Sequence, residues 1–123
     1  MSGPQVLIAE DEAVLRGHLV EVLTERGLQV MQAADGIEAS QILKDNREIS
    51  LLLSDVRMPR MDGYALIDEA ITRDPALKIL MMMGYAGAQS PHPVLKTRDI
   101  ATLIKPFDVD RMCDMVVEML ARP

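Results

Sequence analysis

A nearly continuous apolar run from Ile49 to Ser54 constrains the fold of this 123-residue chain more than any other stretch. Strands with one face in water alternate apolar and polar residues, whereas a strand that is apolar throughout must be buried on both faces. A parallel sheet with helices on both sides provides that burial. The run continues into Asp55 and then into a loop marked by Pro59 and Gly63. Because buried strands rarely end on a lone carboxylate, Asp55 is a candidate functional residue.

Similar apolar runs alternate with amphipathic stretches along the rest of the chain. Strands are predicted at Gln5–Ala9, Leu28–Ala34, Ile49–Ser54, Lys78–Met83 and Ala101–Ile104. The helical spacing of apolar residues predicts helices at Ala13–Arg26, Ile37–Asn46, Tyr64–Thr72 and Val109–Leu120, the last capped by Asp108. This alternation predicts one α/β domain over residues 1–123, with a doubly wound five-stranded parallel sheet covered on both sides.

The segment from residue 84 to residue 100 lies where the fourth helix of such a fold belongs. Pro91 and Pro93 lie in the middle of this segment. A proline in a helix interior costs about 3 kcal/mol and disfavours helix at the residue before it. The sequence therefore predicts a short or absent fourth helix, with a mobile loop in its place.

The net charge and the composition exclude several classes of function. The formal net charge is −6, and an acidic surface repels phosphate backbones, so direct DNA binding is not expected. Cys113 is the single cysteine, which excludes an internal disulfide and fits a reducing cytoplasm. No apolar run approaches the roughly 18 residues of a membrane span, and the N-terminus lacks the basic start of a signal peptide. We therefore expect a cytoplasmic domain outside the membrane.

Polar residues follow several predicted strands at their carboxyl ends, where ligands bind in open α/β sheets. Glu10 and Asp11 follow the first strand, Asp55 ends the third, and Lys105 follows the fifth. Three acids in one crevice repel one another unless a cation joins them, and oxygen ligands of this kind suit Mg²⁺. Beside Mg²⁺ and an ammonium group, Asp55 is suited to attack a phosphoryl group, with Lys105 holding one phosphoryl oxygen.

Each of these residues also has an ordinary structural interpretation when it is taken alone. Asp55 could cap a turn or a helix, and Glu10 and Asp11 could cap the first helix. A lysine such as Lys105 is usually solvated. Only the combination of the acids and the lysine at one edge of the sheet favours a chemical site.

Three motifs in order, AEDE, LLLSDVRMPRMDG and LIKPF, resemble the receiver domain of two-component response regulators along the whole chain. The resemblance implies a flavodoxin-like (CheY-like) fold with strand order 2-1-3-4-5. It also implies that Asp55 accepts a phosphoryl group from a sensor histidine kinase or a phosphotransfer protein. It implies no enzymatic activity beyond Mg²⁺-dependent self-phosphorylation and autodephosphorylation.

The same resemblance implies roles for individual residues around Asp55. Mg²⁺ is the implied cofactor, and its implied ligands are Asp11 and Asp55 directly, Glu10 through water, and the backbone carbonyl of Arg57. Lys105 is implied to contact the phosphoryl group. The peptide bond between Lys105 and Pro106 is implied to be cis.

Two positions depart from the pattern of that family. Met83 stands where the family places serine or threonine, and Thr102 stands where it usually places an aromatic residue. A hydrogen bond to a charged group is worth roughly 1.5–3 kcal/mol, so loss of the hydroxyl removes on the order of 10- to 100-fold of the conventional coupling. We therefore expect phosphorylation to remain and its relay to differ, with the Gly84 N–H and residues 84–100 responding to the phosphoryl group.

Two classes of function remain open on the sequence. One is a stand-alone receiver without an output domain, which signals through contacts with an unidentified downstream protein. The alternative is a phosphate-independent pseudo-receiver that acts as an interaction or adaptor domain. A homodimer through the fourth and fifth helices and a place within a longer regulator are also left open. An aspartate-nucleophile hydrolase is disfavoured, because Arg57 stands where such enzymes carry a second acid.

Overall fold

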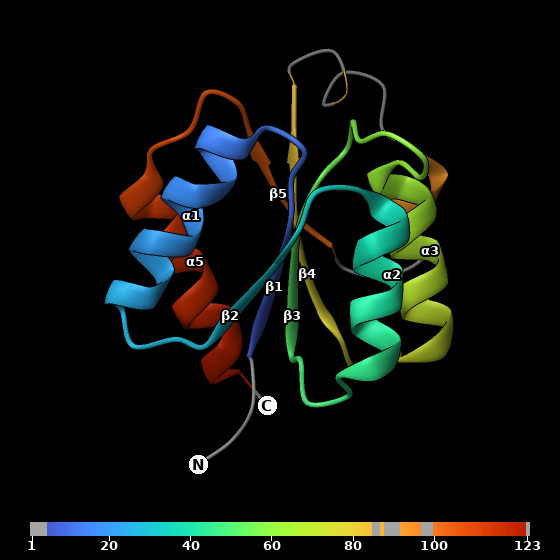
Figure 1. The fold of residues 1–123 in the computed structure, drawn as a ribbon, viewed down its shortest axis with the longest axis horizontal. Coiled ribbons are helices and arrows are strands. Elements are labelled where there is room, and N and C mark those ends of the chain that lie inside the picture. Colours follow the sequence, from blue (N-terminus) through green and yellow to red (C-terminus); the bar gives the residue numbers. More distant parts are fainter. Residues whose placement is uncertain (1–4, 85–86, 88–91, 97–99, 123) are drawn as a thin grey trace.

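Five parallel strands form one sheet in the order β2-β1-β3-β4-β5 (Figure 1). The computed structural model describes residues 5–84, 87, 92–96 and 100–122. The strands within these residues are β1 (Val6–Ala9), β2 (Val30–Ala33), β3 (Leu51–Asp55), β4 (Lys78–Met83) and β5 (Ala101–Ile104). The predicted doubly wound α/β fold and its strand order are therefore confirmed.

Helices cover both faces of this sheet. The α-helices of the described residues are α1 (Ala13–Glu25), α2 (Gly36–Asp45), α3 (Gly63–Arg73) and α5 (Val109–Ala121), and a short 3₁₀ helix, η1, spans Pro93–Lys96. Figure 1 shows α1 and α5 on one face and α2 and α3 on the other. Within the part of the chain described, none of the helices has the length and apolar character needed to cross a membrane.

Every residue of β3 is buried, as its apolar sequence predicts. Leu52 packs into the core on the α2 and α3 side, together with Leu66. Leu51 packs into the core on the opposite side, together with Leu19 of α1. Because both cores hold β3 at the centre of the sheet, they also fix the position of Asp55 at its end.

The edge strand β2 begins at Val30, later than the predicted start at Leu28. Backbone N–H groups just before Val30 form the hydrogen bonds that end α1. Gly27 has a φ of 85°, and its N–H donates to the carbonyl of Thr24 at 2.9 Å. The N–H of Leu28 donates to the carbonyl of Leu23 at 3.3 Å. The strand therefore starts only after the C-terminal cap of α1 is complete.

The described residues between β4 and β5 contain the 3₁₀ helix η1, which begins at Pro93. Proline fits the first position of a helix, because the N–H that it lacks has no helical partner there. This short element agrees with the prediction of a shortened fourth helix. The predicted mobile loop falls largely on residues 85–86, 88–91 and 97–99, which lie outside the described residues.

Candidate functional site

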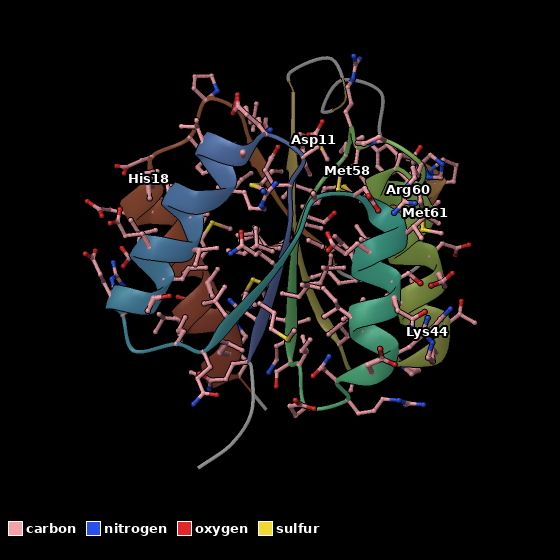
Figure 2. All side chains as sticks on the ribbon, viewed as in Figure 1. Asp11, His18, Lys44, Met58, Arg60 and Met61 are labelled. Carbon is pink, nitrogen blue, oxygen red and sulfur yellow. The ribbon has the colours of Figure 1, made fainter. Side chains whose placement is uncertain are left out.

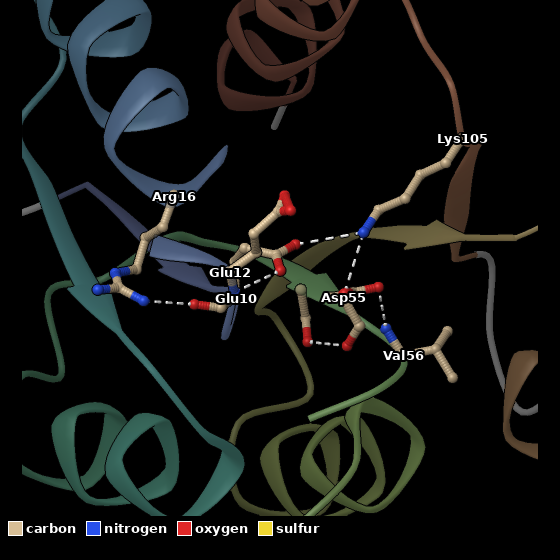
Figure 3. A network of polar contacts seen from close by, with 7 residues as sticks. Glu10, Glu12, Arg16, Asp55, Val56 and Lys105 are labelled. Atoms are coloured by element: carbon tan, nitrogen blue, oxygen red, sulfur yellow. Dashed lines mark hydrogen bonds and ion pairs between the residues drawn. The ribbon is translucent and has the colours of Figure 1, made fainter. Parts of the chain in front are cut away.

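The carboxyl ends of β1 and β3 and the residues that follow β5 bring the predicted acids and the lysine together. Figure 3 shows Glu10, Asp55 and Lys105 of this group. One carboxylate oxygen from each of Glu10, Asp11 and Asp55 lies within 4.8 Å of the other two. Glu10 and Asp55 are buried, with 1% and 8% of their surface exposed, whereas Asp11 is exposed. The acidic cluster thus combines two buried carboxylates with one that faces solvent.

Lys105 bridges the two buried acids of this cluster (Figure 3). Its Nζ donates to Asp55 Oδ2 at 3.0 Å and to Glu10 Oε1 at 3.3 Å. Burial alone would lower the pKa of Lys105, but the hydrogen bond and charge of Asp55, together with Glu10, raise this pKa above its ordinary value. The lysine is therefore held in its charged form and offsets the repulsion between the two carboxylates.

Glu10 is held by two donors at the end of β1. Its Oε2 accepts the backbone N–H of Glu12 at 3.0 Å, and its Oε1 accepts Lys105. Burial raises the pKa of Glu10 to about 7, and the charge of Asp55 adds to this, whereas the Glu12 N–H and Lys105 oppose it. Near neutral pH, Glu10 is therefore only partly ionised when no cation is bound.

The raised pKa of Glu10 predicts that, without metal, the free energy of unfolding falls as the pH rises from 4.5 to about 7. The folded chain binds this proton more tightly than the unfolded chain, so the stabilisation is complete at lower pH and is lost as Glu10 ionises. The slope from this one group approaches about 1.4 kcal/mol per pH unit. Urea unfolding in EDTA across this range measures the slope. Glu10→Gln should remove this component, and equal slopes in the two proteins would contradict it.

Asp55 presents its carboxylate at the end of β3 between two donors. Its Oδ1 accepts the backbone N–H of Val56 at 2.8 Å, and its Oδ2 accepts Lys105 at 3.0 Å. The Ser54 hydroxyl donates to the Asp55 carbonyl oxygen at 2.8 Å, and the backbone of Gly63 lies against the same oxygen. These contacts fix the backbone and orient the carboxylate. A carboxylate held in this way can act as a nucleophile.

Arg16 of α1 belongs to the same network, and the sequence does not reveal it (Figure 3). Its Nη1 donates to the carbonyl oxygen of Glu10 at 2.9 Å, and its Nε donates to Oε1 of Gln32 at 3.0 Å. The arginine thereby ties α1 to the end of β1 and to the edge strand β2. An arginine on a helix is usually solvated, and no motif distinguishes Arg16 from that default.

The donor set of the acidic cluster fits a divalent cation such as Mg²⁺. Carboxylate oxygens are hard ligands, and Mg²⁺ is typically held by one or two carboxylates while it keeps several waters. Arg57, whose carbonyl is the predicted fourth ligand, borders the same open hollow as Asp11. The cluster is therefore compatible with the predicted metal.

Of the two atypical positions, Met83 is the last residue of β4 and Thr102 is the second residue of β5. Met83 is 2% exposed and belongs to the same core as Val94 of η1. A buried thioether therefore occupies the position where the family places a hydroxyl. Thr102 is exposed on β5. Gly84 follows β4 and is exposed, with open space where a side chain would stand. The peptide bond between Lys105 and Pro106 is cis.

Comparisons with known sequences place this chain in one family. The model of the response regulator receiver domain matches residues 6–117. The chain is 34% identical over 116 residues to the response regulator receiver protein CpdR of Brucella abortus (strain 2308), covering 94% of this chain and 96% of that protein. It is 29% identical over 120 residues to sporulation initiation phosphotransferase F of Bacillus subtilis (strain 168), covering 98% and 96%. It is also 35% identical over 118 residues to the sensor kinase CckA of Brucella abortus (strain 2308), but spans 12% of that protein's length.

Solved structures agree with this result. A CheY-like response regulator receiver domain protein from Methanospirillum hungatei JF-1 shares the fold, with a TM-score of 0.87, 24% identity, and coverage of 97% of this chain and 94% of that chain. A response regulator receiver protein from Pseudomonas putida has a TM-score of 0.83 and 27% identity, with coverage of 96% and 98%. The fold and the family match lead to the same conclusion: the chain belongs to the response regulator receiver domain family of two-component systems.

Proposed function

We propose that Asp55 accepts a phosphoryl group from a histidine kinase or a phosphotransfer protein in a cytoplasmic two-component phosphorelay. The observation that carries this proposal is the convergence of Lys105, Glu10 and Asp11 on Asp55 at the end of a buried strand. Similarity to CpdR and to sporulation initiation phosphotransferase F over 96% of each protein supports it. Receiver domains are signalling domains rather than enzymes that turn over an external substrate, and we propose the same for this chain.

The proposed transfer exchanges one bond to phosphorus for another. A carboxylate oxygen of Asp55 bonds to phosphorus while the bond from phosphorus to the donor's histidine nitrogen breaks, and that electron pair stays on the nitrogen. Lys105, 3.0 Å from Asp55 Oδ2, offsets the charge of the phosphoryl oxygens. Asp11, Asp55, the Arg57 carbonyl and, through water, Glu10 would hold Mg²⁺, which neutralises the same oxygens when it is bound. Attack of water on phosphorus later breaks the bond from phosphorus to the Asp55 oxygen, which releases inorganic phosphate and restores the carboxylate.

The signal from this phosphoryl group requires a route other than a hydroxyl at position 83. Met83 is buried and offers no strong hydrogen-bond donor, whereas Gly84 has a backbone N–H just beyond β4. We propose that residues 84–100 respond to the phosphoryl group and that an unidentified downstream protein reads this change. Beryllofluoride, a phosphoryl mimic, should therefore slow amide hydrogen exchange in residues 84–100. Exchange that is identical with and without the mimic would contradict this route.

A phosphate-independent adaptor is the second candidate function. The buried thioether of Met83 and the exposed side chain of Thr102 favour it, because both switch positions lack the usual group. The acids and the lysine of the pocket argue against it, since an adaptor without phosphoryl chemistry does not need them together. The two functions therefore differ in whether the chain gains phosphate.

Incubation with acetyl phosphate and Mg²⁺, followed by intact-mass spectrometry, separates the two functions. A receiver should gain the mass of one phosphoryl group, and EDTA should prevent the gain. A stable absence of added mass would favour the adaptor. A pull-down with and without beryllofluoride then tests whether partner binding depends on phosphate, and light scattering of the same samples tests for a homodimer.

A further inference from the structure

The loop between β3 and α3, residues 56–62, contains an unusual backbone conformation at Arg60. Its φ is 69°, in the left-handed region, and among the described residues Arg60 is the one non-glycine with a positive φ. A residue with a Cβ is disfavoured there, whereas glycine is not. Such a conformation persists where neighbouring contacts hold it, and it often marks a functional constraint.

Those contacts come from Asp35, the residue that caps α2. The Nε of Arg60 donates to Oδ2 of Asp35 at 3.2 Å, and Nη2 donates to Oδ1 at 3.2 Å and to Oδ2 at 3.0 Å. The Oδ1 of Asp35 also accepts the N–H of Glu38 at 2.8 Å. The Glu38 N–H and then Arg60 hold the pKa of Asp35 below its ordinary value, so this carboxylate stays charged. We call this pair the Asp35–Arg60 clamp.

A second contact joins the same two segments. An ideal Cβ on Gly36 would lie 2.1 Å from the carbonyl oxygen of Met61, so the two backbones touch and only glycine fits. Figure 2 shows Arg60 and Met61 beside the N-terminal end of α2. The tip of the 56–62 loop is therefore fixed to α2 by one ionic contact and one backbone contact.

At the base of the same loop, its first residue is joined to the start of α3, next to the end of β3. The N–H of Gly63 donates to the carbonyl of Val56 at 2.7 Å, and the side chain of Met58 is buried. Arg57 lies between these two anchors and borders the hollow that Asp11 also lines. Holding the loop at both ends leaves the backbone of Arg57 little freedom to move relative to the acids.

We propose that the Asp35–Arg60 clamp is a positioning device for the cation site, which holds the loop carrying the Arg57 carbonyl and thereby strengthens binding of a divalent cation. This inference rests on the proposed function, because it takes the Arg57 carbonyl as a ligand. Simple electrostatics predicts the opposite effect of Arg60 on cation affinity. A positive Arg60 near the pocket repels a cation, so its removal would tighten cation binding if charge alone mattered.

Arg60→Asn separates positioning from electrostatics. Asparagine tolerates the left-handed conformation but is too short to clamp Asp35. We expect Mg²⁺ to bind this variant about 10-fold more weakly in isothermal titration calorimetry, at the lower end of the range for groups that orient a metal ligand. The urea midpoint of unfolding should stay close to that of wild type. Arg60→Lys keeps a positive charge toward Asp35 and should recover part of the affinity.

Two further variants complete the comparison. Asp35→Asn keeps the cap on α2 but loses the ion pair, so it should weaken Mg²⁺ binding as Arg60→Asn does. The control is Arg122, which pairs with Glu118 at 2.7 Å near the end of α5 and is 61% exposed, against 60% for Arg60. Arg122→Asn therefore removes an ion pair whose arginine is equally exposed, and it should leave Mg²⁺ binding unchanged.

The possible results of this titration point to different conclusions. A loss of affinity confined to the two clamp variants supports the inference. Unchanged or tighter binding by Arg60→Asn would overturn it, and so would an equal loss in Arg122→Asn. A wild-type chain that binds no Mg²⁺ would instead refute the proposed metal site, and with it the role of the clamp.

Discussion

Replacing Asp55 with asparagine is expected to abolish the gain of phosphoryl mass from acetyl phosphate at every Mg²⁺ concentration. Asparagine has the same shape and keeps an acceptor for the Val56 N–H, but an amide is a poor nucleophile toward phosphorus. Glu10 is not expected to replace it, because Glu10 is 1% exposed and its pKa, raised to about 7, leaves it partly protonated. The loss should therefore be complete rather than partial. Intact-mass spectrometry of the variant measures it.

Asp62→Asn is the matched control for this change. Asp62 lies on the same loop, where its Oδ1 accepts the N–H of Ala65 at 2.9 Å and caps α3. Asparagine caps a helix as well as aspartate does, so this variant should gain phosphoryl mass as wild type does. Phosphoryl addition to Asp55→Asn would show that another residue is the acceptor, and the proposed function would then fail.

A large loss of stability is expected from Gly63→Ala. A Cβ at this position would lie 2.1 Å from the carbonyl oxygen of Asp55 and 3.0 Å from the Cα of Val56. Both are backbone atoms that cannot rotate away, so the start of α3 has to move from the end of β3. Overpacking of this kind costs roughly 3 kcal/mol of the free energy of unfolding. Urea unfolding measures this loss, and phosphorylation should weaken with it because Asp55 moves too.

Gly17→Ala should change the free energy of unfolding in the opposite direction. Gly17 lies in the middle of α1 and is exposed, and nothing beyond its own helix backbone and chain neighbours lies within 4 Å of an added Cβ. Glycine in a helix interior is less stable than alanine by about 0.5–1 kcal/mol, so Gly17→Ala should raise the free energy of unfolding by about that amount. Similar changes at Gly17 and Gly63 would contradict the close contact at Gly63.

The centre of the fold could be predicted from the sequence because burial there is complete. The apolar run that begins at Ile49 marks β3, whose residues are all buried. The apolar pattern that predicts a strand is weaker at the edge of the sheet. In β2, Val30 and Met31 are only partly buried and Gln32 is exposed, so apolar pattern alone does not fix the start of the strand. The start of β2 is set instead by the C-terminal cap of α1. The hydrogen bonds of that cap cannot be read from the pattern of apolar and polar residues.

Motifs at the strand ends were enough to predict which residues gather at the site, but not which contacts they make. The bond from Lys105 to Glu10 depends on the direction of a long flexible side chain. The bond from Arg16 to the Glu10 carbonyl depends on how α1 packs beside β1. Arg60 was the hardest to predict, because local propensity disfavours arginine in a left-handed conformation. Its partner Asp35 is 25 residues away in the sequence and comes close only in the folded chain.

The charges around Lys105 determine which ions the pocket can bind. When all are ionised, three carboxylates against one ammonium leave two negative charges unbalanced, which equals the charge of one divalent ion. An acyl phosphate at Asp55 replaces a singly charged group with a more highly charged one, so the demand for positive charge grows once Asp55 is phosphorylated. The loaded chain should therefore hold a divalent ion more tightly than the free chain does.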